Sequence, residues 1–333
     1  MRCRIAFFYD KMKTINRIVC LDGATLYPAD DSRWAPFAAI ADFEVYARTA
    51  PSELIERIGD AEAILTNKVV IDADTIAALP RLRYIGVLAT GYNVVDTAAA
   101  RAAGIVVTNI PSYSTASVAQ TVFALLLAIT NRVEHYAAEN AAGRWANSPD
   151  FSYRDLEWSE LAGKTFGIVG LGSIGRAVAA IASAMGMRVA VYTSKAASEL
   201  PEGFVKMELD ELFAAADVLS FHCPLTPETR NLVDARRLAL MKPSAIIINT
   251  SRGPVVDEQA LADALNSGRI YAAGLDVLAQ EPPKADCPLL GARNCFITPH
   301  LAWASAEARS RLMEIAVANV RAFTEDCPQN VVN

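Results

Sequence analysis

The sequence predicts an α/β fold with two parallel sheets, each doubly wound so that helices cover both of its faces. Its 333 residues correspond to about two domains at roughly 150 residues each. Short apolar runs alternate with helical patterns in two separate series, and such alternation is typical of parallel sheets. The second series contains a glycine-rich turn of the kind found in nucleotide-binding sheets.

The first series is predicted from five apolar runs and the helical patterns between them. Asp72 and Asp96 are good helix N-caps, and Gly104 is a good C-cap. Residues 1–16 precede the series and are predicted to be a leading extension. The expected strands are Arg17–Leu21, Glu44–Tyr46, Ala63–Thr66, Tyr84–Leu88 and Ile105–Val107, with helices at Ser52–Ile58, Asp72–Leu79 and Asp96–Ala103.

A single long helix is predicted over residues 115–140. Its first half is apolar on nearly every side, and such a helix is buried on all sides, either in a core or between subunits. In a monomer Val118, Phe123, Leu126 and Leu127 would expose an apolar surface, so the helix predicts a dimer. A polar stretch rich in aromatic residues follows at 143–160.

The second series contains six further strands and the helical patterns between them. Six such strands suit one doubly wound nucleotide-binding sheet, and the chain then ends with a helix over Ser305–Thr324 and a polar tail. The expected strands are Thr165–Val169, Arg188–Tyr192, Val218–Phe221, Ala245–Asn249, Tyr271–Leu275 and Phe296–Thr298.

Composition excludes several classes of protein. The 31 basic and 37 acidic residues give a net charge of −6, which argues against nucleic-acid or anionic-membrane binding. The six cysteines form no CxxC pair and there are three histidines, so a structural zinc site is not expected. No apolar run is long enough to span a membrane. We expect scattered, reduced thiols in a cytoplasmic protein.

The glycine-rich turn runs Gly170-Leu-Gly172-Ser-Ile-Gly175. This GxGxxG pattern is weak evidence alone, but here a strand pattern precedes it and a helix pattern follows it. Gly170 permits the tight turn, Gly172 lets a pyrophosphate approach the backbone, and Gly175 lets the helix pack on the strand. The phosphates would lie at the positive end of the helix. The alternative is a purely structural turn.

The next strand ends without an acidic residue. An Asp or Glu about 20 residues beyond the turn binds the ribose 2′-hydroxyl of NAD and repels the 2′-phosphate of NADP. The chain instead has Thr193, Ser194 and Lys195, whose hydroxyls can donate to a phosphate and whose ammonium adds positive charge. We therefore expect NAD or NADP, with use of both. The alternative is a solvated lysine beside two loop hydroxyls.

Three charged residues follow three strands of the second series. Arg252, Glu281 and His300 are expected at the carboxyl edge of the sheet, where ligands of such sheets bind. Arginine binds a carboxylate bidentately, histidine can exchange a proton, and a neighbouring carboxylate orients the ring. Hydride exchange with a 2-keto or 2-hydroxy acid requires these three roles. Taken singly, each residue could be an ordinary surface or strand-end residue.

The other two histidines receive no catalytic role from the sequence. His222 precedes Cys223-Pro224 and is expected to be structural or near a cofactor, and His135 lies on the long helix.

Several long segments resemble the D-isomer-specific 2-hydroxyacid dehydrogenase family, and the resemblance runs from about residue 17 to the end. Leu65–Lys68, Gly86–Asp96 and His300–Arg309 resemble, within the family, the members that interconvert hydroxypyruvate and D-glycerate. The segments that carry the family resemblance are Gly163–Gly175, His222–Thr229, Met241–Glu258, Gly274–Val277 with Glu281-Pro282, and Thr298–His300.

The resemblance implies a role for each site residue. Arg252 would anchor the substrate, His300 would act as acid and base beside Glu281, and the backbone of Ala89, Thr90 and Gly91 would hold the substrate carboxylate. Asp276 would reach the nicotinamide carboxamide. The expected cofactor contacts are Thr90, Gly170, Gly172, Ser173, Ile174, Gly175, Thr193, Ser194, Lys195, Cys223, Thr250, Ser251, Arg252, Asp276 and His300.

The resemblance also implies a domain plan and an activity. Residues 17–112 and 304–333 would form a flavodoxin-like substrate domain, and 113–303 a Rossmann NAD(P) domain, in a homodimer joined through the long helix. The leading activity is reversible hydride transfer between NAD(P)H and hydroxypyruvate. Glyoxylate, pyruvate and phosphoglycerate are alternative substrates of the family, and a dinucleotide-sensing corepressor is the alternative outside enzymes.

Overall fold

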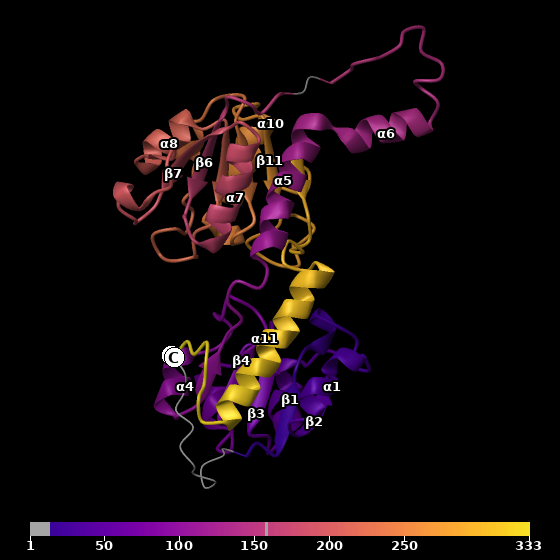
Figure 1. The fold of residues 1–333 in the computed structure, drawn as a ribbon. Coiled ribbons are helices and arrows are strands. Elements are labelled where there is room, and N and C mark those ends of the chain that lie inside the picture. Colours follow the sequence, from indigo (N-terminus) through magenta and orange to yellow (C-terminus); the bar gives the residue numbers. More distant parts are fainter. Residues whose placement is uncertain (1–13, 157–158) are drawn as a thin grey trace. The chain divides into compact units, whose positions relative to one another are not determined.

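The computed structural model in Figure 1 describes residues 14–156 and 159–333. The chain divides into two compact units. The first unit comprises the residues up to Ser114 together with Ala304–Asn333, and the second comprises Thr115–Trp303. Each unit contains one parallel sheet with helices, so the predicted fold class is confirmed.

The first unit is built on a five-stranded sheet in the order β2-β1-β3-β4-β5, and every neighbouring pair is parallel. Its central strands β3 and β4 are buried along their whole length, as expected for a sheet covered on both faces. The strands are β1 (Arg17–Cys20), β2 (Asp42–Val45), β3 (Ala63–Thr66), β4 (Tyr84–Val87) and β5 (Val106–Thr108).

Helices cover both faces of this sheet. On one face Leu54, Ile76 and Ala100, from three different helices, pack with strand residues in one core. On the other face α11 brings Phe323 against Tyr84, with ring centroids 4.9 Å apart (Figure 1). The helices are α1 (Ala35–Ala38), α2 (Leu54–Ile58), α3 (Ala73–Ala77), α4 (Thr97–Ala102) and α11 (Ala306–Thr324).

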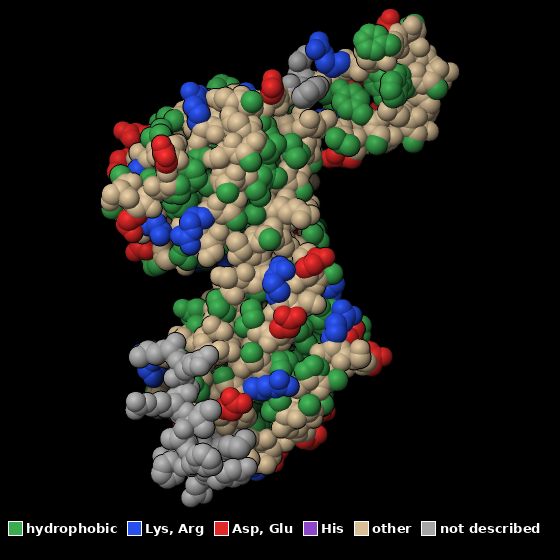
Figure 2. Space-filling view, viewed as in Figure 1, with side chains coloured by type: hydrophobic (Ala, Val, Ile, Leu, Met, Phe, Trp, Pro, Cys, Tyr) green, Lys and Arg blue, Asp and Glu red, His purple; other side chains and the backbone are tan. Residues whose placement is uncertain are grey.

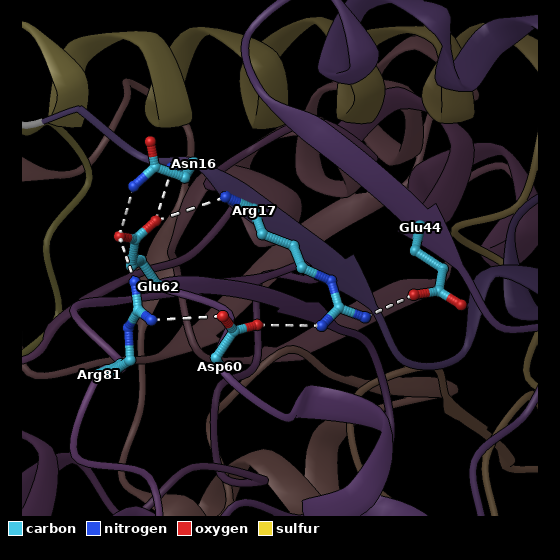
Figure 3. A network of polar contacts seen from close by, with 6 residues as sticks. All are labelled: Asn16, Arg17, Glu44, Asp60, Glu62 and Arg81. Carbon is cyan, nitrogen blue, oxygen red and sulfur yellow. Dashed lines mark hydrogen bonds and ion pairs between the residues drawn. The ribbon is translucent and has the colours of Figure 1, made fainter.

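A polar network ties the amino ends of three strands in this unit (Figure 3). Glu62 accepts hydrogen bonds from the backbone and side chain of Asn16, and Arg17 binds both Glu44 and Asp60. Ile15 is buried. Residues 14–16 of the expected extension therefore contact the sheet, while residues 1–13 lie outside the described part of the chain.

The second unit is built on a seven-stranded parallel sheet in the order β12-β11-β10-β9-β6-β7-β8. The six expected strands are present, and the structure adds β8, which has two residues. The strands are β6 (Thr165–Val169), β7 (Arg188–Tyr192), β8 (Val205–Lys206), β9 (Val218–Phe221), β10 (Ile246–Asn249), β11 (Ala272–Leu275) and β12 (Cys295–Ile297).

Alternate strand residues face two separate cores, one on each side of this sheet. In β10, for example, Ile248 packs with α5 and α7, whereas Ile247 packs with α8 and α10. The helices are α5 (Thr115–Asn131), α6 (Val133–Ala141), α7 (Ser173–Ala184), α8 (Leu209–Ala215), α9 (Ala235–Leu238) and α10 (Glu258–Asn266).

The prediction of one continuous helix over 115–140 is wrong. Arg132 adopts a left-handed conformation with φ of 52°, and α5 and α6 meet there at a bend of 57°. Its guanidinium binds Asn294 Oδ1 at 3.1 Å and lies over the Phe296 ring. These contacts with the start of β12 stabilise a backbone conformation that ends α5.

The burial of α5 also differs from what the sequence predicts. Val118, Phe123 and Leu126 are buried inside the unit, and only Leu127, 37% exposed, remains at the surface. The argument that these four side chains would be uncovered in a monomer is therefore wrong, because three of them are buried in the single chain, Phe123 and Leu126 in the core that includes the sheet and α7. No single helix in the described residues is long and apolar enough to cross a membrane, although the bent pair α5 and α6 passes that test together.

Candidate active site

The strands of the second unit end at one edge of their sheet, and most of the predicted site residues lie in the loops that follow. The backbone N–H of Gly170, after β6, donates to Tyr192 O at the end of β7. The N–H of Asp276, after β11, donates to Asn249 O at the end of β10. Because all seven strands are parallel, these loops form one continuous edge.

The glycine-rich turn has the geometry that its sequence predicts. Gly170 has φ of +96°, and a Cβ placed on it would lie 2.8 Å from the backbone of His222. A Cβ on Gly175 would lie 2.2 Å from Gly170 O, so only glycine lets α7 pack this closely on the turn. A Cβ on Gly172 would meet nothing within 4 Å. Gly172 caps the twelve-residue helix α7, whose first turn contains Ser173 and Ile174.

These features fit a bound dinucleotide. The backbone at Gly172 faces open space beside the positive end of α7, where a pyrophosphate would bind. A buried hydroxyl, Thr250 Oγ1, has no hydrogen-bond partner among the described residues, which suits a group that meets a ligand.

The loop after β7 holds the residues expected at the adenosine ribose. The N–H of Lys195 donates to Thr193 Oγ1 at 3.3 Å, and Ser194 is exposed between them. The ammonium of Lys206 donates to Lys195 O at 2.6 Å. A second cation therefore lies at this loop. Sequence reasoning missed Lys206 because its strand, β8, is too short to show a pattern.

His222 and Cys223 follow β9 beside the glycine-rich turn. The His222 Nε2 lies 2.9 Å from Ser220 Oγ, and burial lowers the pKa of this histidine to about 3. Burial also raises the pKa of Cys223 to about 11, so its thiol stays protonated at neutral pH. A neutral, half-buried His222 is compatible with both expectations, a structural histidine or one near a cofactor.

Arg252 lies in the loop after β10, and its guanidinium makes no ion pair with a carboxylate in the described part of the chain. One of its terminal nitrogens donates to Ser251 O at 2.7 Å. The next residue, Gly253, is buried, and a Cβ placed on it would lie 1.9 Å from the backbone carbon of Leu278. The backbone after Arg252 thus touches the loop after β11 directly.

His300 and Glu281 are brought together by two loops of the same edge. His300 Nδ1 lies 2.5 Å from Glu281 Oε2, and the other carboxylate oxygen accepts a hydrogen bond from Leu278 N at 3.0 Å. Both side chains are partly exposed. The carboxylate is thereby fixed against its own loop while it binds the ring.

Asp276 holds the backbone on both sides of His300. Its buried carboxylate accepts hydrogen bonds from Thr298 Oγ1 at 2.6 Å, from Leu301 N at 3.0 Å and from Ala302 N at 2.9 Å. Its backbone oxygen accepts from His300 N at 2.8 Å. His300 itself has φ of 52°, an uncommon conformation for histidine that these bonds maintain. The sequence did not reveal this contact, because the resemblance assigned Asp276 to the cofactor alone.

The remaining predicted residues belong to the first unit, in the loop after β4. Thr90 Oγ1 donates to Ile110 O at 2.8 Å, and Asn109 Nδ2 donates to Thr90 O at 2.7 Å. The N–H of Ile110 donates to Ala89 O at 2.9 Å. The chain leaving β5 therefore fixes the backbone of Ala89 and Thr90, directly before Gly91.

Known proteins resemble the chain in both sequence and structure. The family described as D-isomer specific 2-hydroxyacid dehydrogenase, NAD binding domain, matches residues 123–302. A hydroxypyruvate reductase of Blautia hydrogenotrophica is 48% identical over 321 residues, covering 95% of this chain and 99% of that protein. A glycerate dehydrogenase of Methylorubrum extorquens is 41% identical over 324 residues, covering 95% and 98%.

A solved structure extends the likeness to the whole fold. It is an NADPH-dependent glyoxylate/hydroxypyruvate reductase of Sinorhizobium meliloti in complex with NADP and malonate. Its TM-score is 0.82 at 30% sequence identity, with 95% of this chain and 96% of that chain covered.

The fold and the edge of loops define an NAD(P)-dependent oxidoreductase with a nucleotide-binding sheet. More specifically, the chain belongs to the D-isomer-specific 2-hydroxyacid dehydrogenase family. Its substrates are small 2-hydroxy and 2-keto acids, and its cofactor is NAD or NADP.

Proposed function

We propose that this enzyme reduces hydroxypyruvate to D-glycerate, reversibly, with NADH or NADPH. The observation that carries the proposal is the 2.5 Å contact between His300 Nδ1 and Glu281 Oε2, on the same sheet edge as Arg252 and the glycine-rich turn. The names of the similar hydroxypyruvate reductase and glycerate dehydrogenase support hydroxypyruvate and glycerate as the substrate pair.

His300 is the acid in this proposal. When bound, the reduced cofactor supplies the hydride that adds to C2 of the keto acid. His300 donates the proton from Nε2 to the carbonyl oxygen, so the C=O becomes an alcohol and the imidazolium becomes neutral imidazole. Glu281 accepts from Nδ1–H, which fixes the orientation of the ring and leaves Nε2 to face the substrate.

Arg252 and the loop after β4 hold the substrate in this proposal. The guanidinium binds the carboxylate with two parallel hydrogen bonds, which aligns C2 and the carbonyl oxygen. We also assign the backbone of Ala89, Thr90 and Gly91 to binding of the substrate carboxylate. We assign the cofactor contacts to Thr90, Gly170, Gly172, Ser173, Ile174, Gly175, Thr193, Ser194, Lys195, Cys223, Thr250, Ser251, Arg252, Asp276 and His300.

Glyoxylate is the second candidate substrate, because the similar solved structure from Sinorhizobium meliloti is named for both glyoxylate and hydroxypyruvate. The deciding measurement is steady-state reduction of hydroxypyruvate, glyoxylate and pyruvate with each of NADH and NADPH. We expect the highest kcat/KM for hydroxypyruvate. A higher value for glyoxylate reassigns the substrate, and no turnover of any acid favours a dinucleotide-sensing protein.

The role of His300 is tested by His300→Ala. We expect kcat to fall by about 10²–10⁴-fold, the usual contribution of general acid catalysis, while NADH affinity measured by fluorescence is maintained. His135→Ala is the matched control, because His135 lies on α6 and binds Asp155 instead. A loss of less than about tenfold for His300→Ala rules out His300 as the acid.

We further propose a cytoplasmic homodimer that forms through an arm, defined here as residues 133–156. The arm folds on itself: Trp145 Nε1 donates to Phe151 O at 3.0 Å, and Arg144 binds Asp155 and lies over Tyr153. Nevertheless Trp145 is 54% and Phe151 91% exposed, and hydrophobic side chains gather on its surface in Figure 2. A second copy that covers these rings would explain such exposure.

The cytoplasmic assignment rests on thiol chemistry. Cys20, Cys223, Cys287 and Cys295 form no disulfide, as is usual in a reducing compartment.

A further inference from the structure

We propose that Asn249 is a positioning residue for substrate binding, because its side chain fixes the backbone from which Arg252 extends. Asn249 Oδ1 accepts hydrogen bonds from Ser251 N at 3.0 Å and from Ser251 Oγ at 2.8 Å. Asn249 Nδ2 donates to Arg252 O at 2.9 Å. The proposal rests on the substrate-anchoring role proposed above for Arg252.

The location of Asn249 makes its side chain a rigid anchor. It is the last residue of β10, in the middle of the sheet between β9 and β11, and it is 0% exposed. Its own backbone oxygen accepts from Asp276 N at 2.9 Å. The amide therefore cannot move without disturbing the centre of the sheet, and no water competes for its hydrogen bonds.

The three bonds hold the chain on both sides of Arg252. The bond to Ser251 N fixes the peptide between Thr250 and Ser251, one residue before the arginine, and the bond to Arg252 O fixes the peptide directly after it. Beyond that point Gly253 lies against the backbone of Leu278. Because a misplacement of about 1 Å at a reacting group can cost about 10²-fold in rate, this restraint matters for a side chain as long as arginine.

The contacts require an amide rather than any polar group. The amide oxygen of Asn249 accepts hydrogen bonds from an N–H and a hydroxyl, and the amide NH₂ group donates one to a carbonyl oxygen. Aspartate would keep the acceptor for Ser251 but would place a carboxylate oxygen against Arg252 O, where no proton is available. Alanine would remove all three bonds.

A double-mutant cycle tests whether Asn249 acts through Arg252. The full chain is assayed as wild type, Asn249→Ala, Arg252→Ala and the double variant, with hydroxypyruvate and saturating NADH. We expect Asn249→Ala to lower kcat/KM by about tenfold or more, mainly by raising KM for the keto acid. In the Arg252→Ala background the same change should alter kcat/KM by less than about twofold, because the residue it positions is gone.

Two further variants separate positioning from a loss of stability. Asn294→Ala is the control. The side-chain amide of Asn294 also forms hydrogen bonds at both ends, because Nδ2 donates to Tyr271 O and Oδ1 accepts from Arg132. Asn294 precedes β12, however, and so lies at the amino ends of the strands, opposite the edge that carries Arg252. Its kinetics should stay within about twofold of wild type even if its thermal midpoint falls. Asn249→Asp should lose at least about fivefold in kcat/KM through the missing bond to Arg252 O.

The outcomes are distinct. An equal loss for Asn249→Ala with and without Arg252 overturns the positioning role, and so does wild-type kinetics in Asn249→Asp. If Asn249→Ala does not fold, Asn249→Asp and its cycle with Arg252→Ala decide the question. If Arg252→Ala alone matches wild type, the proposed substrate anchor fails instead, whatever Asn249 does.

Discussion

Two histidines of the second unit show how the surroundings of a residue determine its chemistry. His300 is partly exposed, and its ring is held by the carboxylate of Glu281. His222 lies beside the hydroxyl of Ser220, and burial holds its pKa near 3. His222 therefore stays neutral at neutral pH, whereas the ring of His300 is oriented by a carboxylate at the edge of the sheet.

The low pKa of His222 predicts a stability effect in acid. In the unfolded chain the pKa of histidine is about 6.5, so between pH 6.5 and about pH 3 the unfolded state binds the proton and the folded state does not. Acidification through this window therefore destabilises the fold, by up to about 1.4 kcal/mol for each pH unit. In His222→Asn this contribution is absent.

Urea unfolding at pH 8 and pH 5 measures this effect. From pH 8 to pH 5 we expect wild type to lose up to about 2 kcal/mol more unfolding free energy than His222→Asn. The comparison at pH 8, where histidine is neutral in both states, sets the baseline. Equal losses for the two proteins would contradict a buried, neutral His222.

At the residue scale, the sequence was sufficient to find the charged groups but not what holds them. Arg252, Glu281 and His300 could be predicted because each follows a recognisable strand, and parallel strands end at one edge. The bonds from Asn249 and Asp276 could not be predicted, because they depend on the backbone angles of the loops. The left-handed conformation of His300 could not be predicted either, because the residue is not a glycine and the sequence gives no other signal for a positive φ.

Among the elements, the edge formed by β7 and β8 has the clearest consequence for cofactor choice. Thr193 and Lys195 share a hydrogen bond in the loop after β7, and Lys206 of β8 binds the same loop. The edge thus has two cations and lacks the acidic residue that would repel a 2′-phosphate. Exposed ion pairs contribute only about 0–1 kcal/mol, so we expect use of both cofactors rather than a strict preference for NADPH.

Thr193→Asp should restore a preference for NADH. The new carboxylate would repel the 2′-phosphate, and we expect kcat/KM for NADPH to fall by about tenfold or more, while the value for NADH changes little. Thr193→Asn is the matched control, because it has the same shape without the charge and should still use NADPH. An unchanged cofactor ratio in Thr193→Asp would show that this loop does not meet the ribose.

The elements themselves could be predicted wherever the pattern was local. The apolar runs located eleven of the twelve strands in the described residues, with boundaries that differ by at most two residues. The pattern could not reveal β8, which has two residues, or the break between α5 and α6. That break has neither proline nor glycine, and it depends on contacts of Arg132 with Asn294 and Phe296, far away in the sequence.

At the scale of the whole molecule, the first unit is assembled from the two ends of the chain. The tail after α11 returns to β5, where Val332 N donates to Val107 O at 2.9 Å and Asn109 N donates to Asn330 O at 3.1 Å. The second unit is one uninterrupted segment, and the arm leaves it after α5. Among the described residues of the second unit, the most exposed aromatic side chain, Phe151, lies in the arm.

The proposed dimer should depend on the arm. Phe151→Glu should raise the dissociation constant by about 10²-fold or more, because burial of a phenylalanine contributes about 1.5–3 kcal/mol and a two-fold axis uses the residue twice. Sedimentation velocity at micromolar concentration measures the change. Val70→Glu, at a 59% exposed position of the first unit, is the control. A dimer unaffected by Phe151→Glu would place the interface elsewhere.

The contact at Gly253 limits how this enzyme could be redesigned. A Cβ at Gly253 would overlap the backbone of Leu278, so the loop that carries Arg252 is packed directly against the loop that carries Glu281. The two loops therefore behave as one rigid element. Neither can be lengthened or shifted to admit a larger substrate without displacing the other, and with it the partner of His300. Engineering of substrate range should therefore begin at the loop after β4, whose ties to the chain leaving β5 lie wholly within the first unit.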